Sequence, residues 1–206
     1  MTEDRERKRT GEGPEEARIA LRRAEAGEDA RLRGLYETAF PPEERAPYRL
    51  LKRRARGGRA DFWSLYDGDE WAGFAYVLPY ADLAYLFFFA VAPEKRGRGA
   101  GSGAIRALRE KYMGRRLFVA VEEPDPEAAN AAQRERRHAF YARCGMRDLP
   151  YRVWEVGAEF MTMGFGGPVE PEEYNAMTDA WLGWPARLFL RMRMFDEPEE
   201  KGENDG

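Results

Sequence analysis

The chain has 206 residues, of which 43% are hydrophobic, and this is enough for one sizeable core in a single domain. Charged residues make up 34%, but the net charge is only −3, which argues against general nucleic-acid binding because that would call for a basic excess. The one cysteine, Cys144, excludes an intramolecular disulfide framework and suits a reducing compartment. No apolar run approaches the roughly 20 residues that span a bilayer, and no apolar segment follows the charged start of the chain. A soluble cytoplasmic protein without membrane contact is therefore expected.

The first half of the chain predicts a strand, two helices and an aromatic hairpin, after a charged leader that is typical of disorder. Helical spacing of apolar residues stops at the pair Pro41-Pro42, and an Asp-Gly turn at Asp67 separates two aromatic segments. The expected elements are the leader at 1–16, a strand at 18–23, helices at 27–40 and 48–54, and hairpin strands at 62–66 and 71–78.

The second half predicts strands that alternate with helices, as in an α/β protein. A crossover helix joins two apolar strands, so these two strands are expected to be parallel. The expected elements are a central strand at 83–92, a helix ending near 113, a strand at 117–121, a helix at 127–144, strands at 147–156 and 160–164, and a helical segment at 172–195 that Pro185 interrupts.

The loop after the central strand alternates arginine with glycine and leads into a helix. The start of a helix leaves backbone N–H groups without partners and carries partial positive charge. Glycines allow an anion to approach that backbone, and Lys95, Arg96 and Arg98 add full charges around it. This pattern predicts a phosphate or pyrophosphate site.

The same loop resembles the acyl-CoA-binding motif of the GNAT superfamily of N-acetyltransferases, Arg/Gln-x-x-Gly-x-Gly/Ala. The motif is read here as Arg96-Gly97-Arg98-Gly99-Ala100-Gly101, after an apolar strand that ends in Val91-Ala92-Pro93. The order of elements matches that family from about residue 17 to 164. The resemblance implies an α/β GNAT (acyl-CoA N-acyltransferase) fold, with a mixed central sheet flanked by helices and splayed parallel strands at the cofactor site.

A second segment, His138-Ala139-Phe140-Tyr141-Ala142-Arg143-Cys144-Gly145-Met146, resembles the other signature of the family, a helix that ends in Leu/Phe-Tyr-x-x-x-Gly-Phe. The resemblance implies that Tyr141 lies beside the thioester sulfur and protonates the departing thiolate. The family often has an asparagine that contacts the cofactor seven residues before this tyrosine, and this chain has Arg134 there.

The resemblance also implies the cofactor, acetyl-CoA, and the reaction, direct transfer of an acetyl group to a primary amine of a small molecule. Backbone amides of the glycine loop are expected to bind the cofactor diphosphate, and the end of the central strand to bind the pantetheine arm. The expected cofactor-binding residues are Phe89, Ala90, Val91, Arg96, Gly97, Arg98, Gly99, Ala100, Gly101, Ser102, Arg134 and Tyr141.

A carboxylate is expected to take the proton from the acceptor amine, directly or through water. Glu43 and Glu44 follow Pro41-Pro42, at the helix junction that borders the acceptor pocket in the family. Glu122 follows the strand expected beside the central strand, where a splayed sheet would place an active site. Glu43 or Glu44 is favoured slightly over Glu122.

Two alternatives remain open. The chain could be a GNAT-fold sensor or interaction module that binds acyl-CoA without transferring the acyl group. It could instead bind NAD, because Gly99–Ala104 fits a dinucleotide fingerprint, although four residues separate it from the strand. His138 is the only histidine, so no metal site is expected.

The expected organisation is a leader at 1–16, an acetyltransferase domain at 17–164, a helical extension packed on the domain at 165–195, and an acidic tail at 196–206. Trp181, Trp184 and Phe189 of the extension are expected to cover a face of the sheet or to meet a partner subunit, which leaves a homodimer open.

Overall fold

The computed structural model describes residues 17–155, 158–183 and 193–195. The elements up to the central strand are β1 (Ile19–Arg23), the short 3₁₀ turn η1 (Ala26–Glu28), α1 (Asp29–Ala39), the 3₁₀ turn η2 (Pro42–Glu44), α2 (Tyr48–Arg56), β2 (Asp61–Asp67), β3 (Glu70–Tyr80) and β4 (Leu83–Val91). Those that follow are the 3₁₀ turn η3 (Pro93–Lys95), α3 (Ala100–Lys111), β5 (Arg116–Val121), α4 (Ala131–Arg143), β6 (Arg147–Glu155), β7 (Ala158–Gly164), α5 (Pro171–Leu182) and β8 (Arg193–Phe195).

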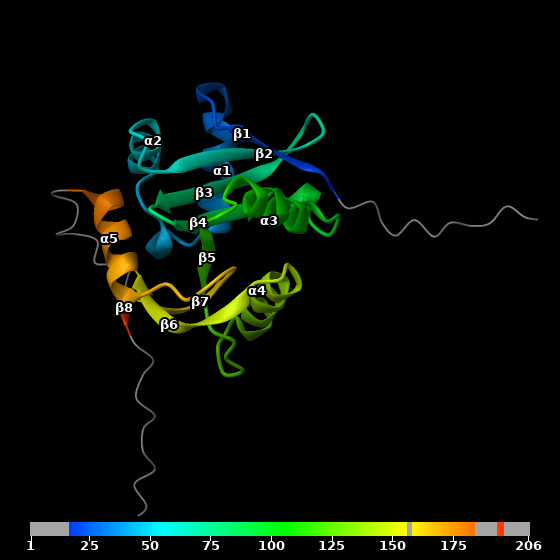
Figure 1. Ribbon diagram of the computed structural model, residues 1–206. Helices are drawn as coiled ribbons and strands as arrows, with labels where there is room; N and C mark the ends of the chain where they lie inside the picture. The colour runs from blue at the N-terminus through cyan, green and yellow to red at the C-terminus, as the bar shows by residue number, and fades with distance from the viewer. Residues whose placement is uncertain (1–16, 156–157, 184–192, 196–206) are drawn as a thin grey trace, which may run out of the picture.

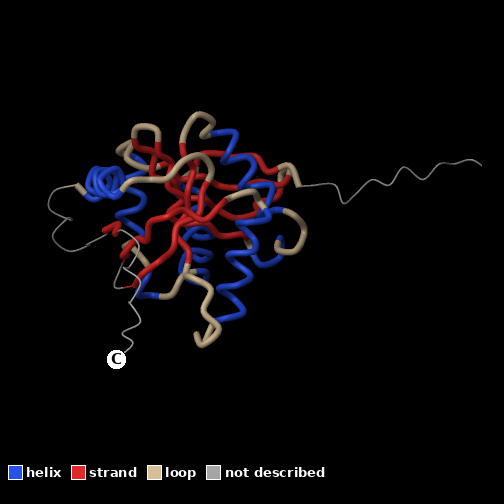
Figure 2. Tube along the Cα trace, turned by 60° about the horizontal axis from the view of Figure 1, so that its bottom comes forward, coloured by secondary structure: helices blue, strands red, loops and turns tan. Residues whose placement is uncertain are grey.

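The strands form a single mixed sheet in the order β1-β2-β3-β4-β5-β7-β6-β8. Helices surround the sheet in Figures 1 and 2, with the strands gathered in the middle of the molecule. Among the strand pairings of the described residues only β4–β5 is parallel, as the crossover through α3 requires. The expected α/β fold with a mixed sheet is confirmed.

The last part of the chain differs from the sequence-based expectation. The segment 172–195 was expected to be helical with an interruption at Pro185, but α5 ends at Leu182 and Arg193–Phe195 pairs with β6 as a strand. Gly183 follows α5 with φ of 60°, a conformation that glycine adopts easily and that ends a helix. Pro185, Trp184 and Phe189 lie outside the described residues.

Successive side chains of a strand point to opposite faces of the sheet, and here both faces carry a hydrophobic core. On one face, Tyr76, Tyr85 and Phe118 pack with residues of α1, α2 and α5. On the other face, Ala75 and Leu117 pack with residues of α3 and α4. The helices α3 and α4, which carry parts of the two sequence motifs, therefore lie on the second face.

Strand β4 leaves its parallel neighbour soon after the strand begins. The two strands pair only from Leu83↔Arg116 to Tyr85↔Phe118. From Leu86 to Val91, β4 is paired with β3 on one edge and has no described strand on the other. The expected splay of the two parallel strands is thus present in the structure.

A β-bulge coincides with this divergence. Tyr76 of β3 is opposite Phe88 and Val77 is opposite Leu86, so Phe87 is an extra residue on β4. The bulge turns Phe87 and Phe88 toward the same face, where both rings pack against the core beside α1 and α5. The bulge therefore lies just beyond the last residue of β4 that pairs with β5.

Helix α5 covers the sheet on the face of α1 and α2 (Figure 1). Trp181 is buried and its indole N–H donates to the hydroxyl of Tyr76, 3.2 Å away. The side chain of Arg116 joins the start of α5 to the sheet by contacting both Glu173 and Asp82. The extension therefore packs on the core of its own chain.

Gly73, on β3 opposite Val91, is predicted to be essential for this geometry. Its φ is 144°, and a methyl group there would collide with the carbonyl oxygen of Ala90. We expect Gly73→Ala to reduce the free energy of unfolding by about 2–4 kcal/mol, measured by urea denaturation.

Gly34→Ala is the matched control for this substitution. Gly34 lies on the exposed side of α1 and a methyl group there meets nothing within 4 Å. Alanine should stabilise the helix by about 0.5–1 kcal/mol. Equal effects of the two substitutions would contradict the prediction.

Candidate active site

The glycine loop presents a row of free backbone amides. Gly97 and Gly99 have φ values of 74° and 80°, which other residues adopt only at a cost in strain. Within the described part of the chain, no amide from Gly97 to Ser102 has a hydrogen-bond acceptor, and the first such bond of α3 is from Gly103 N to Gly99 O, at 2.9 Å. These donors lie at the positive end of the helix dipole, and free amides in that position bind anions.

Side chains hold this loop against the end of β4. Arg96 Nε donates to the carbonyl oxygen of Val91 at 3.0 Å, and Lys95 pairs with Glu70 in the β2–β3 hairpin. Gly101 lies so close to α4 that an added Cβ would be 3.1 Å from a ring carbon of Phe140. The loop, β4 and α4 are therefore fixed around the space between them.

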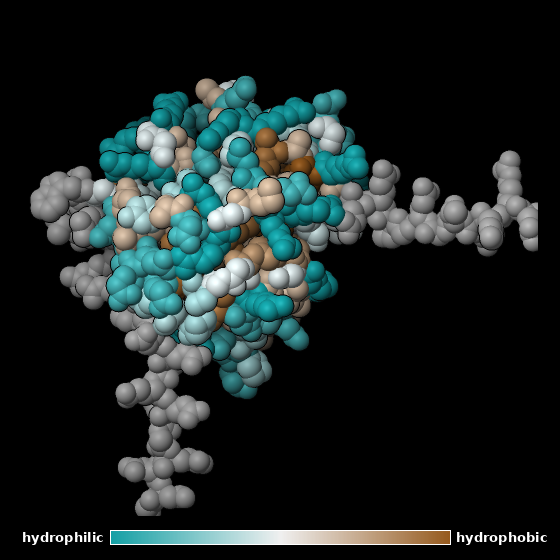
Figure 3. All heavy atoms as spheres, viewed as in Figure 1, coloured by the Kyte–Doolittle hydropathy of each residue, from teal (hydrophilic) through white to brown (hydrophobic). Residues whose placement is uncertain are grey.

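A cavity of about 480 Å³ opens between the glycine loop and α4. In Figure 3, apolar residues are visible in the seam between the regions of α3 and α4, with hydrophilic residues around them. The lining of the cavity combines aromatic rings with arginine side chains. Its lining residues include Phe89, Val91, Arg96, Gly97, Gly99, Gly101, Ser102, Arg137, Phe140, Tyr141 and Arg143.

A second cavity of about 430 Å³ passes through the gap between β4 and β5. It shares Phe89, Val91, Arg96, Arg137 and Tyr141 with the first cavity, so the two meet at these residues. Its other lining residues include Phe40, Glu44, Tyr85, Phe87, Phe88, Ala90, Glu155 and Phe160. The second cavity therefore extends from the α3–α4 face of the sheet to the face covered by α1 and α5.

Tyr141 is buried where the two cavities meet. Its hydroxyl has no hydrogen-bond partner among the described residues. Burial raises the pKa of this hydroxyl above its usual value, so it is protonated at neutral pH. Tyr141 can thus donate a proton to a group that enters the cavity from either side.

The three glutamates that the sequence suggested as proton acceptors lie in different environments. Glu44, on η2, is half-buried and lines the second cavity, and burial and the charge of Glu122 raise its pKa. Glu43 is exposed and lines neither cavity. Glu122 also lies outside the lining and accepts hydrogen bonds from Arg137 Nη1 and Asn130 Nδ2, both at 2.9 Å.

Glu122 holds Arg137 in place at the meeting point of the cavities. Arg134, which stands where the family often has asparagine, contacts Glu122 at 3.2 Å and Asn130 at 2.7 Å. It does not line either cavity. Arg98, in the glycine loop, and Ala100, the first residue of α3, do not line the cavities either. The remaining residues expected to bind the cofactor line at least one of the two cavities.

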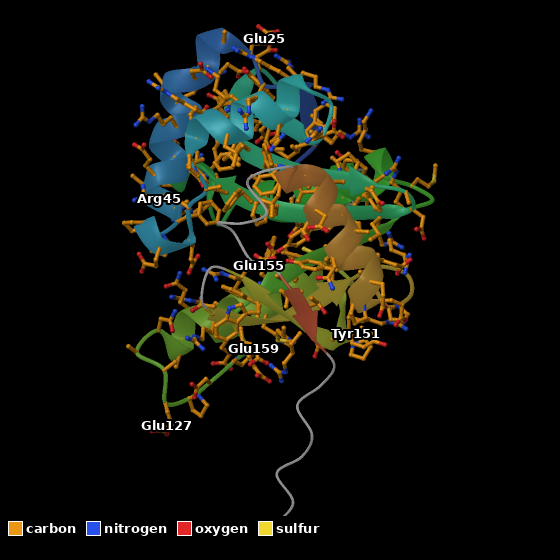
Figure 4. All side chains as sticks on the ribbon, turned by 90° about the vertical axis from the view of Figure 1, so that its left-hand side faces the viewer. Glu25, Arg45, Glu127, Tyr151, Glu155 and Glu159 are labelled. Carbon is orange, nitrogen blue, oxygen red and sulfur yellow. The ribbon has the colours of Figure 1, made fainter. Side chains whose placement is uncertain are left out.

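Sequence reasoning missed Glu155, at the end of β6. Its side chain is buried, with 7% of the residue exposed, and lines the second cavity. Figure 4 shows Glu155 in the interior between the upper and lower parts of the molecule, whereas Glu25 and Glu127 lie at its periphery. The available signal was its position two residues after Val153, on the inward face of a strand where a carboxylate is rare.

Two tyrosine hydroxyls donate to the same oxygen of this carboxylate. Tyr85, on β4, donates to Glu155 Oε1 at 2.6 Å, and Tyr174, on α5, donates to the same atom. Burial raises the pKa of Glu155 to about 7, the hydroxyls oppose this increase, and the charge of Glu44 adds to it. A carboxyl group that changes protonation near neutral pH therefore faces the cavity.

Comparison with known proteins identifies the class of this site. The model of the acetyltransferase (GNAT) family matches residues 30–146. The chain belongs to this family. A comparison with curated protein sequences finds no match.

Solved structures of the family share the fold. A GNAT-family protein of Bacteroides thetaiotaomicron superposes with a TM-score of 0.59 at 22% identity, over 79% of this chain and 95% of that one. The ribosomal-protein-S18-alanine N-acetyltransferase of Escherichia coli gives a TM-score of 0.52 at 22% identity, over 75% and 97%. A Bacillus subtilis acetyltransferase in complex with CoA gives 0.50 at 16% identity, over 74% and 99%.

No helix in the described ranges is long and apolar enough to cross a membrane.

The dinucleotide-binding hypothesis for Gly99–Ala104 is not supported by this fold. That fingerprint belongs to a parallel sheet with a tight turn directly after the strand. Here the sheet is mostly antiparallel, and the turn η3 separates β4 from the glycines.

The raised pKa of Glu155 predicts a distinctive pH dependence of stability. The pKa is about 7 in the folded protein and near the ordinary value of 4.5 in the unfolded chain. Between these values the folded state binds more protons, so the stabilisation is fully present below pH 4.5 and is lost as the pH rises through 7. Between these limits the wild type should lose about 2–3 kcal/mol of unfolding free energy relative to Glu155→Gln.

The measurement is urea denaturation of both proteins at a series of pH values. Taking the difference between the two removes the contributions of other carboxylates, such as Glu123 and Glu173, whose pKa values are lowered by Arg152 and Arg116. A difference that stays constant with pH would show that Glu155 has an ordinary pKa.

Proposed function

We propose that the chain is an acetyl-CoA-dependent N-acetyltransferase that transfers the acetyl group to a primary amine of a small molecule by direct attack on the thioester. The observation that carries this proposal is the continuous cavity from the free amides of the glycine loop, past Tyr141, to two carboxylates. Membership of the acetyltransferase (GNAT) family supports the class of reaction.

The first cavity fits the chemistry of coenzyme A. The amides from Gly97 to Ser102 match the oxygens of a diphosphate, and Arg96 adds positive charge. The unpaired edge of β4 from Leu86 to Val91 offers backbone donors and acceptors to the amides of a pantetheine arm. When bound there, acetyl-CoA supplies the activated acetyl group at the gap in the sheet.

Tyr141 is placed to assist the leaving thiolate. It lies at the meeting point of the cavities, and its hydroxyl is protonated at neutral pH, as in any tyrosine, with burial raising its pKa further. Since an ordinary thiol has a pKa near 8.5, a thiolate can leave without a proton donor, and the assistance of Tyr141 accelerates the step without being indispensable.

The second cavity supports a small amine as the acceptor. Its volume of about 430 Å³ suits a small molecule, and its walls combine aromatic rings with polar and charged side chains. Glu44 and Glu155 place negative charge at this end of the passage, which favours an ammonium group over an anion.

Coenzyme A binding is predicted to depend on Arg96. We expect Arg96→Ala to raise the Kd for CoA about 10-fold or more, because a charge-assisted contact with the diphosphate and the anchor on Val91 are both lost. Isothermal titration calorimetry measures the change. Arg109→Ala, at the other end of α3, removes the same charge and should leave the Kd within about twofold.

Catalysis is predicted to depend on the hydroxyl of Tyr141. We expect Tyr141→Phe to lower kcat about 10–100-fold and to leave the Kd for CoA unchanged, since only the proton donor is lost. Thiol release from acetyl-CoA across a series of amines measures the rate. Binding of CoA by the wild type without turnover of any amine would favour the acyl-CoA-binding module instead, and competition between NAD and CoA would revive the dinucleotide hypothesis.

A further inference from the structure

Two carboxylates reach the second cavity, and their surroundings differ. Glu44 is half-buried and near Arg137, whose charge lowers its pKa while burial and Glu122 raise it. Glu155 is buried, and no arginine or lysine of the described ranges pairs with it. A buried carboxylate without a protein cation stabilises a ligand that brings a positive charge, because the ligand then offsets the cost of burial.

The two carboxylate oxygens of Glu155 also differ in their hydrogen bonds. Both tyrosine hydroxyls donate to Oε1, and among the described residues Oε2 has no hydrogen-bond partner. Because Glu155 lines the cavity, Oε2 is the atom available to a molecule inside it. The tyrosines fix the carboxylate from β4 and α5, which leaves one oxygen free and defines where a proton would be received.

The position of Glu155 matches the requirements of the acceptor amine. The cavity passes through the gap in the sheet, with Tyr141 on the α3–α4 side and Tyr85 and Glu155 on the opposite side. Phe40, Phe87 and Phe160 line the passage, and aromatic faces accommodate an ammonium group with its apolar substituent. An amine that enters from the α1–α5 side meets Glu155 before it reaches the thioester position.

We propose that Glu155 is the group that takes the proton from the acceptor amine, and that Tyr85 and Tyr174 hold its carboxylate for this step. The inference deepens the proposed acetyl transfer and rests on it. It assigns the acceptor to the alkylamines that are protonated in solution, and it makes α5, which lies outside the residues matched by the family model, part of the catalytic site.

The protons balance as follows. Glu155 takes one proton from the ammonium group, which leaves a neutral amine, and later releases that proton to water. As the new C–N bond forms and the C–S bond breaks, Tyr141 delivers its proton to the departing sulfur, and the second proton from the nitrogen passes through water to Tyr141 and restores its hydroxyl. The products are the amide, the thiol and one proton in solution.

The first experiment measures the titration of Glu155 in the free protein, without acetyl-CoA. In protein labelled with ¹³C at the glutamate side-chain carboxyl, one resonance should titrate near pH 7, and Glu155→Gln should remove it. Absence of such a resonance in the wild type would overturn the proposal.

The second experiment compares the pH dependence of kcat/KM between variants. The groups that face Glu155 are Tyr85 from β4, Tyr174 from α5 and Glu44 from η2. The ascending limb near pH 7 should disappear in Glu155→Gln, which leaves only the rise at higher pH that ionisation of the alkylamine itself causes. The limb near pH 7 should move to higher pH in Tyr174→Phe, which loses a hydrogen bond to the charged form, and to lower pH in Glu44→Gln, which loses a like charge.

The third experiment separates proton removal from a structural role. At pH 7, Glu155→Gln should lower kcat/KM for an alkylamine about 100–1000-fold. An aromatic amine, which is neutral at this pH, needs no such removal, and its rate should fall less than about threefold. Glu127→Gln, an exposed site at the periphery in Figure 4, is the matched control and should change neither rate.

The outcomes distinguish the two proposals. Equal losses with both amines would indicate a structural role for Glu155 and overturn the inference alone, as would an unchanged ascending limb in Glu155→Gln. If CoA binds and no amine of either kind is acetylated by the wild type, the proposed function fails, and the inference fails with it.

Discussion

The hydrogen-bond ladder between β4 and β5 stops after three residues, and the geometry of the candidate site depends on this interruption. Backbone N–H and C=O groups buried without partners cost free energy, so a strand edge inside a fold is normally paired. Here no described strand pairs with the edge from Leu86 to Val91, and a bulge at Phe87 lies within this segment. A ligand that has amide groups of its own can form hydrogen bonds with this open edge of β4. Ligand binding therefore depends on the interruption of pairing between β4 and β5.

The gap also separates two kinds of charge. On the α3–α4 face, the free amides of the glycine loop and Arg96 create a positive region. At the other end of the passage, Glu44 and Glu155 create a negative one. An anionic donor and a cationic acceptor would therefore be attracted to opposite ends and meet at Tyr141. The fold imposes this order because the sheet itself is the partition between the two regions.

The sequence was most informative where function follows from local chemistry. The glycine loop could be located because its positive φ values and its free amides both depend on consecutive residues. Tyr141 was singled out because the end of its helix resembles a signature of the family. The parallel pairing of β4 and β5 followed from the crossover helix. These features involve residues close together in the chain.

Features that depend on distant partners could not be found in this way. Glu43, Glu44 and Glu122 look equivalent as residue types, and only the packing of α4 shows that Glu122 is bonded to Arg137. The environment of Glu155 is set by Tyr85, which lies 70 residues earlier, and by Tyr174, which lies 19 residues later. The strand β8 was mistaken for a helix because its pairing with β6 outweighs the helical spacing of the segment.

The buried carboxylate explains why α5 must be held firmly. Moving a carboxylate out of water costs several kcal/mol, and each hydrogen bond to its charged form returns about 1.5–3 kcal/mol. Tyr174 supplies one of these bonds only if its helix is fixed.

Contacts fix α5 at both ends. Arg116 contacts Glu173 in the first turn, with 2.5 Å between Nη2 and Oε1, and Arg54 donates to the carbonyl oxygen of Leu182 in the last. Between them, Trp181 is buried against Tyr76. The ionisation of Glu155 and the docking of α5 are thus energetically linked, since loosening the helix would remove a donor from the carboxylate and shift its charge toward the neutral form. In this way a helix outside the region matched by the family model controls the protonation of a group at the centre of the site.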